Sequence, residues 1–251
     1  EPMEVGPTCH YFMGGIKVDA NTTMSSVPGL FACGECAAGM HGANRLGGNS
    51  LSDLLVFGYL SGKNAAEYAA KKGSHDSLDE DQVRKIIRNA TDILNRESGA
   101  NPYLLHETLE TNMQEHVGII RSKENLEKGI DALEKMKADY QTVKAKGASQ
   151  FNPGWHEALA MRNLLITAEA VARAALQREE SRGAHSRSDF PGEQDEWLNY
   201  NIVSKKGADG NMSLSKTERL KPDPEMERIA KSTIEDLEKE IAQEQGKVGA
   251  E

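Results

Sequence analysis

The feature that most restricts the fold is a glycine-rich run at residues 41–51, which reads HGANRLGGNSL. It leads directly into an apolar stretch, so the pattern predicts a turn followed by a helix. Asn49 or Ser50 is expected to cap that helix, and Ser50 with Asp53 has the S-x-x-D form of a capping box. The chain is therefore expected to turn sharply here and to begin a helix at about residue 50.

The same run has the chemistry of an anion-binding site. A helix N-terminus offers unpaired N–H groups and a partial positive charge, and glycines let a ligand approach the backbone closely. Arg45 can hold a carboxylate or phosphate through two parallel hydrogen bonds. The alternative is a turn into a core helix with Arg45 as a surface charge, and the residues alone leave both interpretations open.

Three further segments accompany this run in a fixed order. Residues 7–16 read PTCHYFMGGI, residues 27–35 read VPGLFACGE, and residues 181–187 read SRGAHSR. With residues 41–51, they resemble segments of the succinate dehydrogenase/fumarate reductase flavoprotein subunits. Any one of these motifs alone would be a weak signal, but four in order are specific.

The resemblance implies an FAD-dependent enzyme that interconverts succinate and fumarate. Electrons would pass to an iron–sulfur subunit and then, through membrane anchor subunits, to quinone. His10 and Arg45 would bind the substrate carboxylates, while Glu35, Ser50 and Leu51 would contact FAD. The implied location is cytoplasmic, peripheral on the inner face of the cell membrane through partner subunits. The alternative enzyme is L-aspartate oxidase, a relative that shares HGANR and SRG elements but typically lacks so long a tail.

Two parts that the family uses are missing from the sequence. No strand–turn–helix with a G-x-G-x-x-G pattern, which would bind the FAD pyrophosphate, is present. The capping-domain arginine that transfers the proton also has no counterpart. We therefore expect the C-terminal part of a longer flavoprotein, without a catalytic residue of its own and inactive alone. A helical assembly module that only binds a partner is the non-enzymatic alternative.

Composition argues against several other classes. The 251 residues carry a formal net charge of -9, from 39 acidic and 30 basic residues, which disfavours nucleic acid as a partner. No apolar run reaches the roughly 18–20 residues of a membrane span. Three cysteines are too few for a disulfide scaffold. Cys33 and Cys36 offer only two of the about four ligands that zinc requires, so we predict no metal site.

We predict an α+β chain in three parts. Residues 1–73 are expected to be the end of an FAD-binding domain, with a buried strand at 30–32 and a helix over about 50–72. Residues 74–180 are expected to form a helical bundle. Residues 181–251 are expected to form a small β-hairpin and a C-terminal tail helix.

Four segments of the expected bundle have apolar residues at helical spacing. Their helices are predicted to begin at Asp79, Asn101, Ser122 and Trp155. On the first of them, Val83, Ile86, Ile87 and Ile93 are expected to form part of a core face.

In the last part, alternation predicts strands at 197–203 and 212–215, joined by a turn at 205–211. A single helix is predicted over about 225–245. The basic residues Arg182, His185 and Arg187 could dock a partner, or could satisfy carboxylates and carbonyls between the bundle and the tail. We favour the second interpretation.

Overall fold

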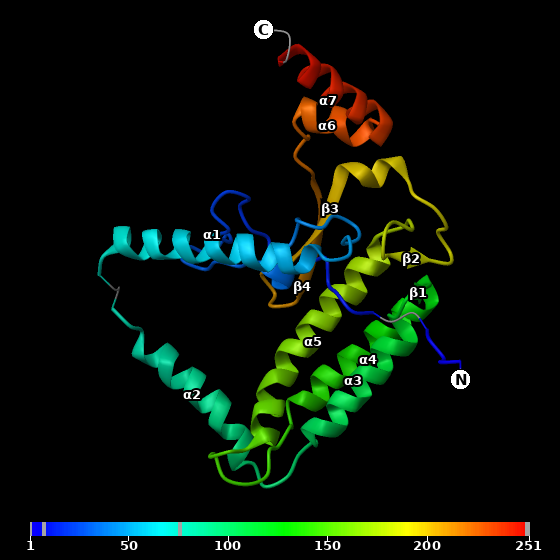
Figure 1. Cartoon of the computed structure of the whole chain (residues 1–251). Helices are drawn as coiled ribbons and strands as arrows, with labels where there is room; N and C mark the ends of the chain where they lie inside the picture. Colours follow the sequence, from blue (N-terminus) through cyan, green and yellow to red (C-terminus); the bar gives the residue numbers. More distant parts are fainter. Residues whose placement is uncertain (1, 7–8, 75–76, 249–251) are drawn as a thin grey trace.

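The computed structural model describes residues 2–6, 9–74 and 77–248 of the chain. The α+β fold class is confirmed: an irregular N-terminal region leads to one long helix, then to a helical region, and finally to a hairpin with two short helices (Figure 1). The helices are α1 Asn49–Lys72, α2 Glu80–Asn95, α3 Pro102–His116, α4 Lys123–Tyr140, α5 Pro153–Gln177, α6 Pro224–Lys231 and α7 Ile234–Val248. The remaining elements are the 3-10 turns η1 Gly34–Cys36 and η2 Asp195–Asn199, and the strands β1 Ile120–Arg121, β2 Ser186–Arg187, β3 Tyr200–Lys206 and β4 Met212–Glu218.

The N-terminal region is built from turns and isolated bridges. The strand predicted at residues 30–32 is wrong, because Phe31 forms only an isolated antiparallel bridge with Met24. Beside this bridge, the Ser25 N–H donates to the Leu30 carbonyl and the Ala32 N–H donates to the Thr23 carbonyl, and the Leu30 side chain is exposed. A strand needs a partner along its length, and the local apolar pattern cannot supply one.

Helix α1 begins and ends close to the predicted residues, but its cap differs. Gly48 is the N-cap, with φ of +82°, and no side chain caps the helix there. The predicted capping box is therefore wrong, because the Asp53 carboxylate is bonded to Tyr11 and His41 instead. At the other end, Gly73 has φ of +74° and donates its N–H to the Ala69 carbonyl, as expected of a glycine that ends a helix.

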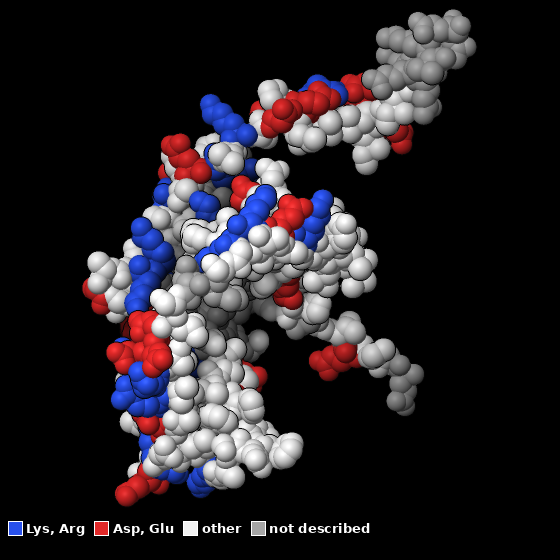
Figure 2. Space-filling model, turned by 90° about the vertical axis from the view of Figure 1, so that its left-hand side faces the viewer, with Lys and Arg blue, Asp and Glu red and all other residues white. Residues whose placement is uncertain are grey.

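Two helices carry apolar residues that this chain leaves uncovered. On α1, Leu51 and Leu55 are exposed, and on α2 the predicted core residues Ile86 and Ile87 are exposed as well. Helix α2 meets the bundle through its C-terminal half, where Ile93 is buried (Figure 1). Figure 2 views the molecule from the left-hand side of Figure 1, where α2 lies, and shows a broad uncharged area beside a band of charged side chains.

The hydrophobic core lies among α3, α4 and α5, where Leu126, Leu133 and Met161 are fully buried. The helix starts follow the predicted caps: the side chains of Asn101 and Ser122 each accept a hydrogen bond from a backbone N–H in the first turn. The predicted starts of α2, α3 and α4 are confirmed. Helix α5 begins slightly earlier than predicted, after its cap Asn152.

The C-terminal region differs from the prediction in its strand bounds, since both strands end three residues later than predicted, and in its tail helix. Trp197 lies in η2, so the first strand begins only at Tyr200 and pairs antiparallel with β4, from Tyr200 opposite Glu218 to Lys206 opposite Met212. The predicted tail helix is broken into α6 and α7. The Thr233 hydroxyl accepts from the Asp236 N–H and donates to its carboxylate, so a second helix start interrupts the first.

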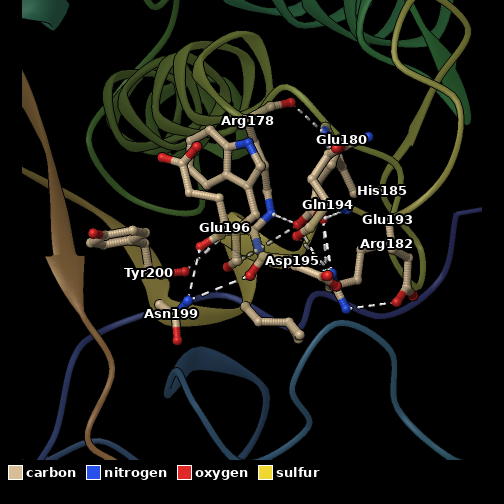
Figure 3. A network of polar contacts seen from close by, with 12 residues as sticks. Arg178, Glu180, Arg182, His185, Glu193, Gln194, Asp195, Glu196, Asn199 and Tyr200 are labelled. Carbon is tan, nitrogen blue, oxygen red and sulfur yellow. Dashed lines mark hydrogen bonds and ion pairs between the residues drawn. The ribbon is translucent and has the colours of Figure 1, made fainter.

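A buried carboxylate, Glu180, ties the end of α5 to the C-terminal region (Figure 3). It is fully buried and accepts hydrogen bonds from Arg178 at 2.9 Å, from Arg182 at 3.0 Å and from the Gln194 N–H at 2.9 Å. Burial alone would raise the pKa of Glu180, but the bonds from Arg182 and Gln194, with the charge of Arg178, lower it on balance. The carboxylate is therefore ionised in the folded chain.

We expect Glu180→Ala to lower the free energy of unfolding of the chain by about 3–5 kcal/mol, because it leaves two guanidinium groups without their shared partner. Glu193→Ala is the matched control, since that carboxylate also pairs with Arg182 but is 62% exposed; its cost should stay below about 1 kcal/mol. Urea unfolding monitored by circular dichroism measures both values. Similar costs for the two variants would contradict the role of Glu180.

Candidate functional site

The predicted site residues gather around the short segment at residues 10–12. The Phe12 N–H donates to the Glu35 carboxylate at 2.8 Å, which fixes the loop that carries Glu35 against this segment. The Ser50 hydroxyl interacts with the Tyr11 side chain, so the first turn of α1 is joined to the same segment. His10 itself is exposed. The structure thus brings together loops that are 23 to about 40 residues apart in sequence.

Three polar side chains form a cluster beneath this segment, which we call the Tyr11 cluster: Tyr11, His41 and Asp53. Asp53 Oδ2 lies 3.4 Å from the Tyr11 hydroxyl and 3.1 Å from His41 Nε2, and the hydroxyl lies 3.3 Å from the same nitrogen. The side chains of His41 and Asp53 are only 8% and 5% exposed. Burial, together with the negative charge of Asp53, raises the pKa of Tyr11, so its hydroxyl keeps its proton and can donate.

Arg45 packs on the face of the Tyr11 ring, with its guanidinium carbon 4.5 Å from the ring centroid. A guanidinium in this position is attracted to the electrons of the ring. Its Nη1 donates to the Leu46 carbonyl at 3.0 Å, whereas the buried Nε has no hydrogen-bond partner. A buried N–H donor without a partner is costly, so this end of the side chain is suited to an anionic acceptor.

The loop that carries Arg45 contacts the turn at residues 181–187 through its backbone. The Ala184 N–H donates to the Ala43 carbonyl at 3.0 Å. Gly183 has φ of +58°, and a Cβ added there would lie 2.3 Å from the same carbonyl oxygen. Only glycine permits both this backbone conformation and this close approach.

The basic residues of that turn are satisfied inside the protein. Arg187 is almost fully buried, pairs with Asp189 at 2.8 Å, and donates to the carbonyls of Ala175 and Leu176 at the end of α5. Arg182 pairs with Glu180 and Glu193. These contacts agree with the interpretation that the turn satisfies carboxylates and carbonyls between the bundle and the tail.

His185 joins this turn to β1 and to the end of α5. Its Nδ1 lies 2.9 Å from Arg121 Nη1 and its Nε2 lies 3.2 Å from the Arg178 carbonyl. Arginine can only donate, so Nδ1 is the acceptor and Nε2 carries the hydrogen. Burial, reinforced by the positive charges of neighbouring arginines, lowers the pKa of His185 to about 4. The ring is therefore neutral.

Comparison with known proteins decides the family. The profile described as fumarate reductase flavoprotein C-term matches residues 106–240, and the profile described as FAD binding domain matches residues 1–51. The chain belongs to the succinate dehydrogenase/fumarate reductase flavoprotein family. It corresponds to the C-terminal portion of those proteins, and the FAD-binding family implies FAD as the cofactor of the full-length protein.

Two curated relatives and one solved structure show the extent of the match. The fumarate reductase flavoprotein subunit of Escherichia coli is 37% identical over 219 residues, which cover 85% of this chain and 36% of that protein. The succinate dehydrogenase flavoprotein subunit of Coxiella burnetii is 37% identical over 219 residues, which cover 82% of this chain and 37% of that protein. Mycobacterium smegmatis Sdh1 in complex with UQ1 superposes with a TM-score of 0.83 at 45% identity, covering 88% and 37%. The chain thus spans little more than a third of these family members.

Sequence reasoning missed two residues of the site. Tyr11 was part of a matching segment without a role of its own, and Asp53 was assigned to a helix cap. The signal that could have found them is the presence of an aromatic residue and a carboxylate in segments that the family resemblance places in one site with Arg45. Among the described residues, no three His, Cys, Asp or Glu side chains could hold a metal ion, and no helix is long and apolar enough to cross a membrane.

We expect the free energy of unfolding to fall as the pH decreases from about 6.5 towards 4. In this range the His185 ring binds a proton in the unfolded chain but stays neutral in the folded chain. His185→Gln removes the titrating ring and should weaken this pH dependence. Urea unfolding at pH 7 and pH 5 measures it, with exposed His156→Gln as the control. Parallel losses in the wild type and His185→Gln would contradict the prediction.

Proposed function

We propose that this chain supplies the carboxylate-binding and flavin-facing residues of a full-length flavoprotein that interconverts succinate and fumarate. The observation that carries the proposal is the guanidinium of Arg45, stacked on Tyr11 beside the His10 segment and left with a buried N–H unpaired. The proposed enzyme is an FAD-dependent oxidoreductase that acts on the CH–CH bond of its substrate.

In this proposal, Arg45 and His10 divide the two ends of a dicarboxylate between them. The planar guanidinium of Arg45 holds one carboxylate through two parallel hydrogen bonds, which a lysine could not match. The imidazole of His10 donates to the other carboxylate. A substrate held at both ends presents one C–H bond in a fixed direction, and this orientation supplies a large part of the rate enhancement.

Part of an FAD site is compatible with the first turn of α1. No side chain caps this helix, Gly47 and Gly48 leave open space where a Cβ would lie, and Leu51 is exposed. Ser50, Leu51 and Glu35 would hold the flavin, and the positive end of α1 would favour negative charge on it. When bound, FAD supplies a two-electron acceptor. The pyrophosphate requires a glycine-rich strand–turn–helix that this sequence does not contain.

The proposed partners follow from the relatives. The proteins of E. coli and C. burnetii are named as flavoprotein subunits, and the M. smegmatis structure contains UQ1. We propose that electrons pass from this flavoprotein to an iron–sulfur subunit, then through membrane anchor subunits to quinone. The location would be cytoplasmic, peripheral on the inner face of the cell membrane. The exposed apolar face of α1 is consistent with burial against the rest of an FAD-binding domain.

The substrate separates this proposal from the L-aspartate oxidase alternative. Reduction of an artificial electron-accepting dye by the full-length flavoprotein should proceed with succinate and not with L-aspartate. Activity with aspartate would move the protein to the oxidase branch. Activity with neither, in a protein that binds FAD, would support the non-catalytic assembly alternative.

We expect Arg45→Ala in the full-length flavoprotein to lower succinate turnover by about a hundredfold or more, because one carboxylate loses its fixed partner. Bound flavin, measured by its visible absorption, should be retained. Arg84→Ala, at an exposed position on α2, is the matched control and should leave turnover unchanged. Unchanged turnover in Arg45→Ala, or loss of flavin, would refute the assignment.

A further inference from the structure

We propose that the Tyr11 cluster is a positioning device that holds the Arg45 guanidinium ready for a carboxylate and fixes its place relative to His10. The inference deepens the proposed function and rests on it, because it takes Arg45 to be the carboxylate-binding residue. Tyr11, His41 and Asp53 are positioning residues in this scheme. They act on the substrate through Arg45.

The anchor of the device is the carboxylate of Asp53. An ionised carboxylate only accepts hydrogen bonds, so both the Tyr11 hydroxyl and His41 Nε2 must donate to it. Both side chains of the His41–Asp53 pair are more than nine-tenths buried. The His41 contact, at 3.1 Å, is the shorter of the two, and a hydrogen bond to a charged group is stronger than one between neutral groups. Asp53 lies within α1, so the cluster is fixed to a rigid element.

Tyr11 transmits this restraint to Arg45. Its hydroxyl is held by Asp53 and His41, and the edge-to-face contact of its ring with the His41 ring, at 5.3 Å between centroids, limits rotation of the ring plane. The face of the same ring carries the guanidinium of Arg45, which is therefore restrained by the ring. The Tyr11 hydroxyl thus contacts the Asp53 anchor, and the Tyr11 ring contacts the Arg45 guanidinium.

Arg45 needs such support because its own hydrogen bonds are few. Its one hydrogen bond in the described structure goes to the carbonyl of the neighbouring residue Leu46, which leaves the long side chain weakly restrained. Arginine loses up to about 2 kcal/mol of rotamer entropy when it is ordered. A ring that orders the side chain in advance removes much of that cost from substrate binding.

The cluster also joins the segments that carry the other candidate residues. Tyr11 follows His10 directly, His41 is four residues before Arg45, and Asp53 is one helical turn after Ser50. A cluster that only satisfied buried polar groups would not need to connect all three segments. This arrangement fixes the segment that carries His10 against the loop that carries Arg45.

The test uses the full-length flavoprotein with FAD bound. Tyr11→Leu should raise the KM for succinate, and the Kd for the unreactive dicarboxylate malonate, by about tenfold each. The kcat should change by less than about threefold, and the flavin absorption should be unchanged, because Tyr11 is not assigned to the reaction itself. Tyr11→Phe keeps the ring but loses the hydroxyl anchor, so its effect should be intermediate. Tyr103→Leu, on α3, is the matched control.

A double-variant cycle separates positioning from a general structural role. If Tyr11 acts through Arg45, Tyr11→Leu should change kcat/KM by less than about twofold in the Arg45→Ala background. An undiminished effect there would overturn the inference. Asp53→Glu, which keeps a carboxylate, should raise the KM for succinate less than Asp53→Asn, which removes the charge.

The two proposals fail in different ways. Unchanged KM and Kd in Tyr11→Leu, with both raised in Arg45→Ala, would overturn the positioning role and leave the proposed function standing. Unchanged succinate turnover in Arg45→Ala would overturn the proposed function itself. If Tyr11→Leu does not fold, the nearly isosteric Tyr11→Phe decides: a raised KM supports the positioning role, and an unchanged KM overturns it.

Discussion

The attachment of the 181–187 turn and of the C-terminal region to α5 depends on one ionised carboxylate, that of Glu180, in a place where water does not reach it. Two guanidinium groups and a backbone N–H satisfy its oxygens, and the desolvation cost of such a group is tolerable only when its partners are in place. Because those partners come from both sides of the turn at 181–187, the turn is fixed at the end of α5. Its Gly183 and Ala184 then meet Ala43. The bundle thereby supports a loop that belongs to another region of the sequence.

Two polar clusters in this protein differ in how completely they are satisfied, and the difference indicates their roles. Around Glu180, the guanidiniums contact carboxylates, carbonyls and an aromatic ring, as Arg178 does with Trp197. Around Tyr11, the hydrogen bonds are longer and Arg45 keeps a buried N–H without a partner. A closed network stabilises a fold, whereas one that leaves a buried donor unpaired is suited to a ligand that completes it.

Local signals in the sequence predicted much of the fold. Asn101 and Ser122 cap their helices because a side-chain oxygen three or fewer residues away satisfies the first N–H groups, and this needs no distant partner. Predictions failed where a distant partner decides. Residues 30–32 pair with residues 23–25 through one bridge only, which is too short for a strand, and most of the apolar face of α2 finds no surface to cover it. The candidate site shows the same division: motifs pointed to Arg45, but the contact of Tyr11 with Asp53 spans 42 residues and only the folded chain reveals it.

The hydrogen bond between Ala184 and Ala43 can form only late in the synthesis of the chain. A ribosome makes the chain from its N-terminus, and domains fold as they emerge. The loop that carries Arg45 is complete long before the turn that supports it, since the two alanines are 141 residues apart in the sequence. At a translation rate of about 5–20 residues per second, this loop waits roughly 7 to 28 seconds without its support. A nascent chain interrupted before Gly183 would contain every residue proposed to bind the substrate. The loop that carries Arg45 would still lack the backbone contact that fixes its conformation.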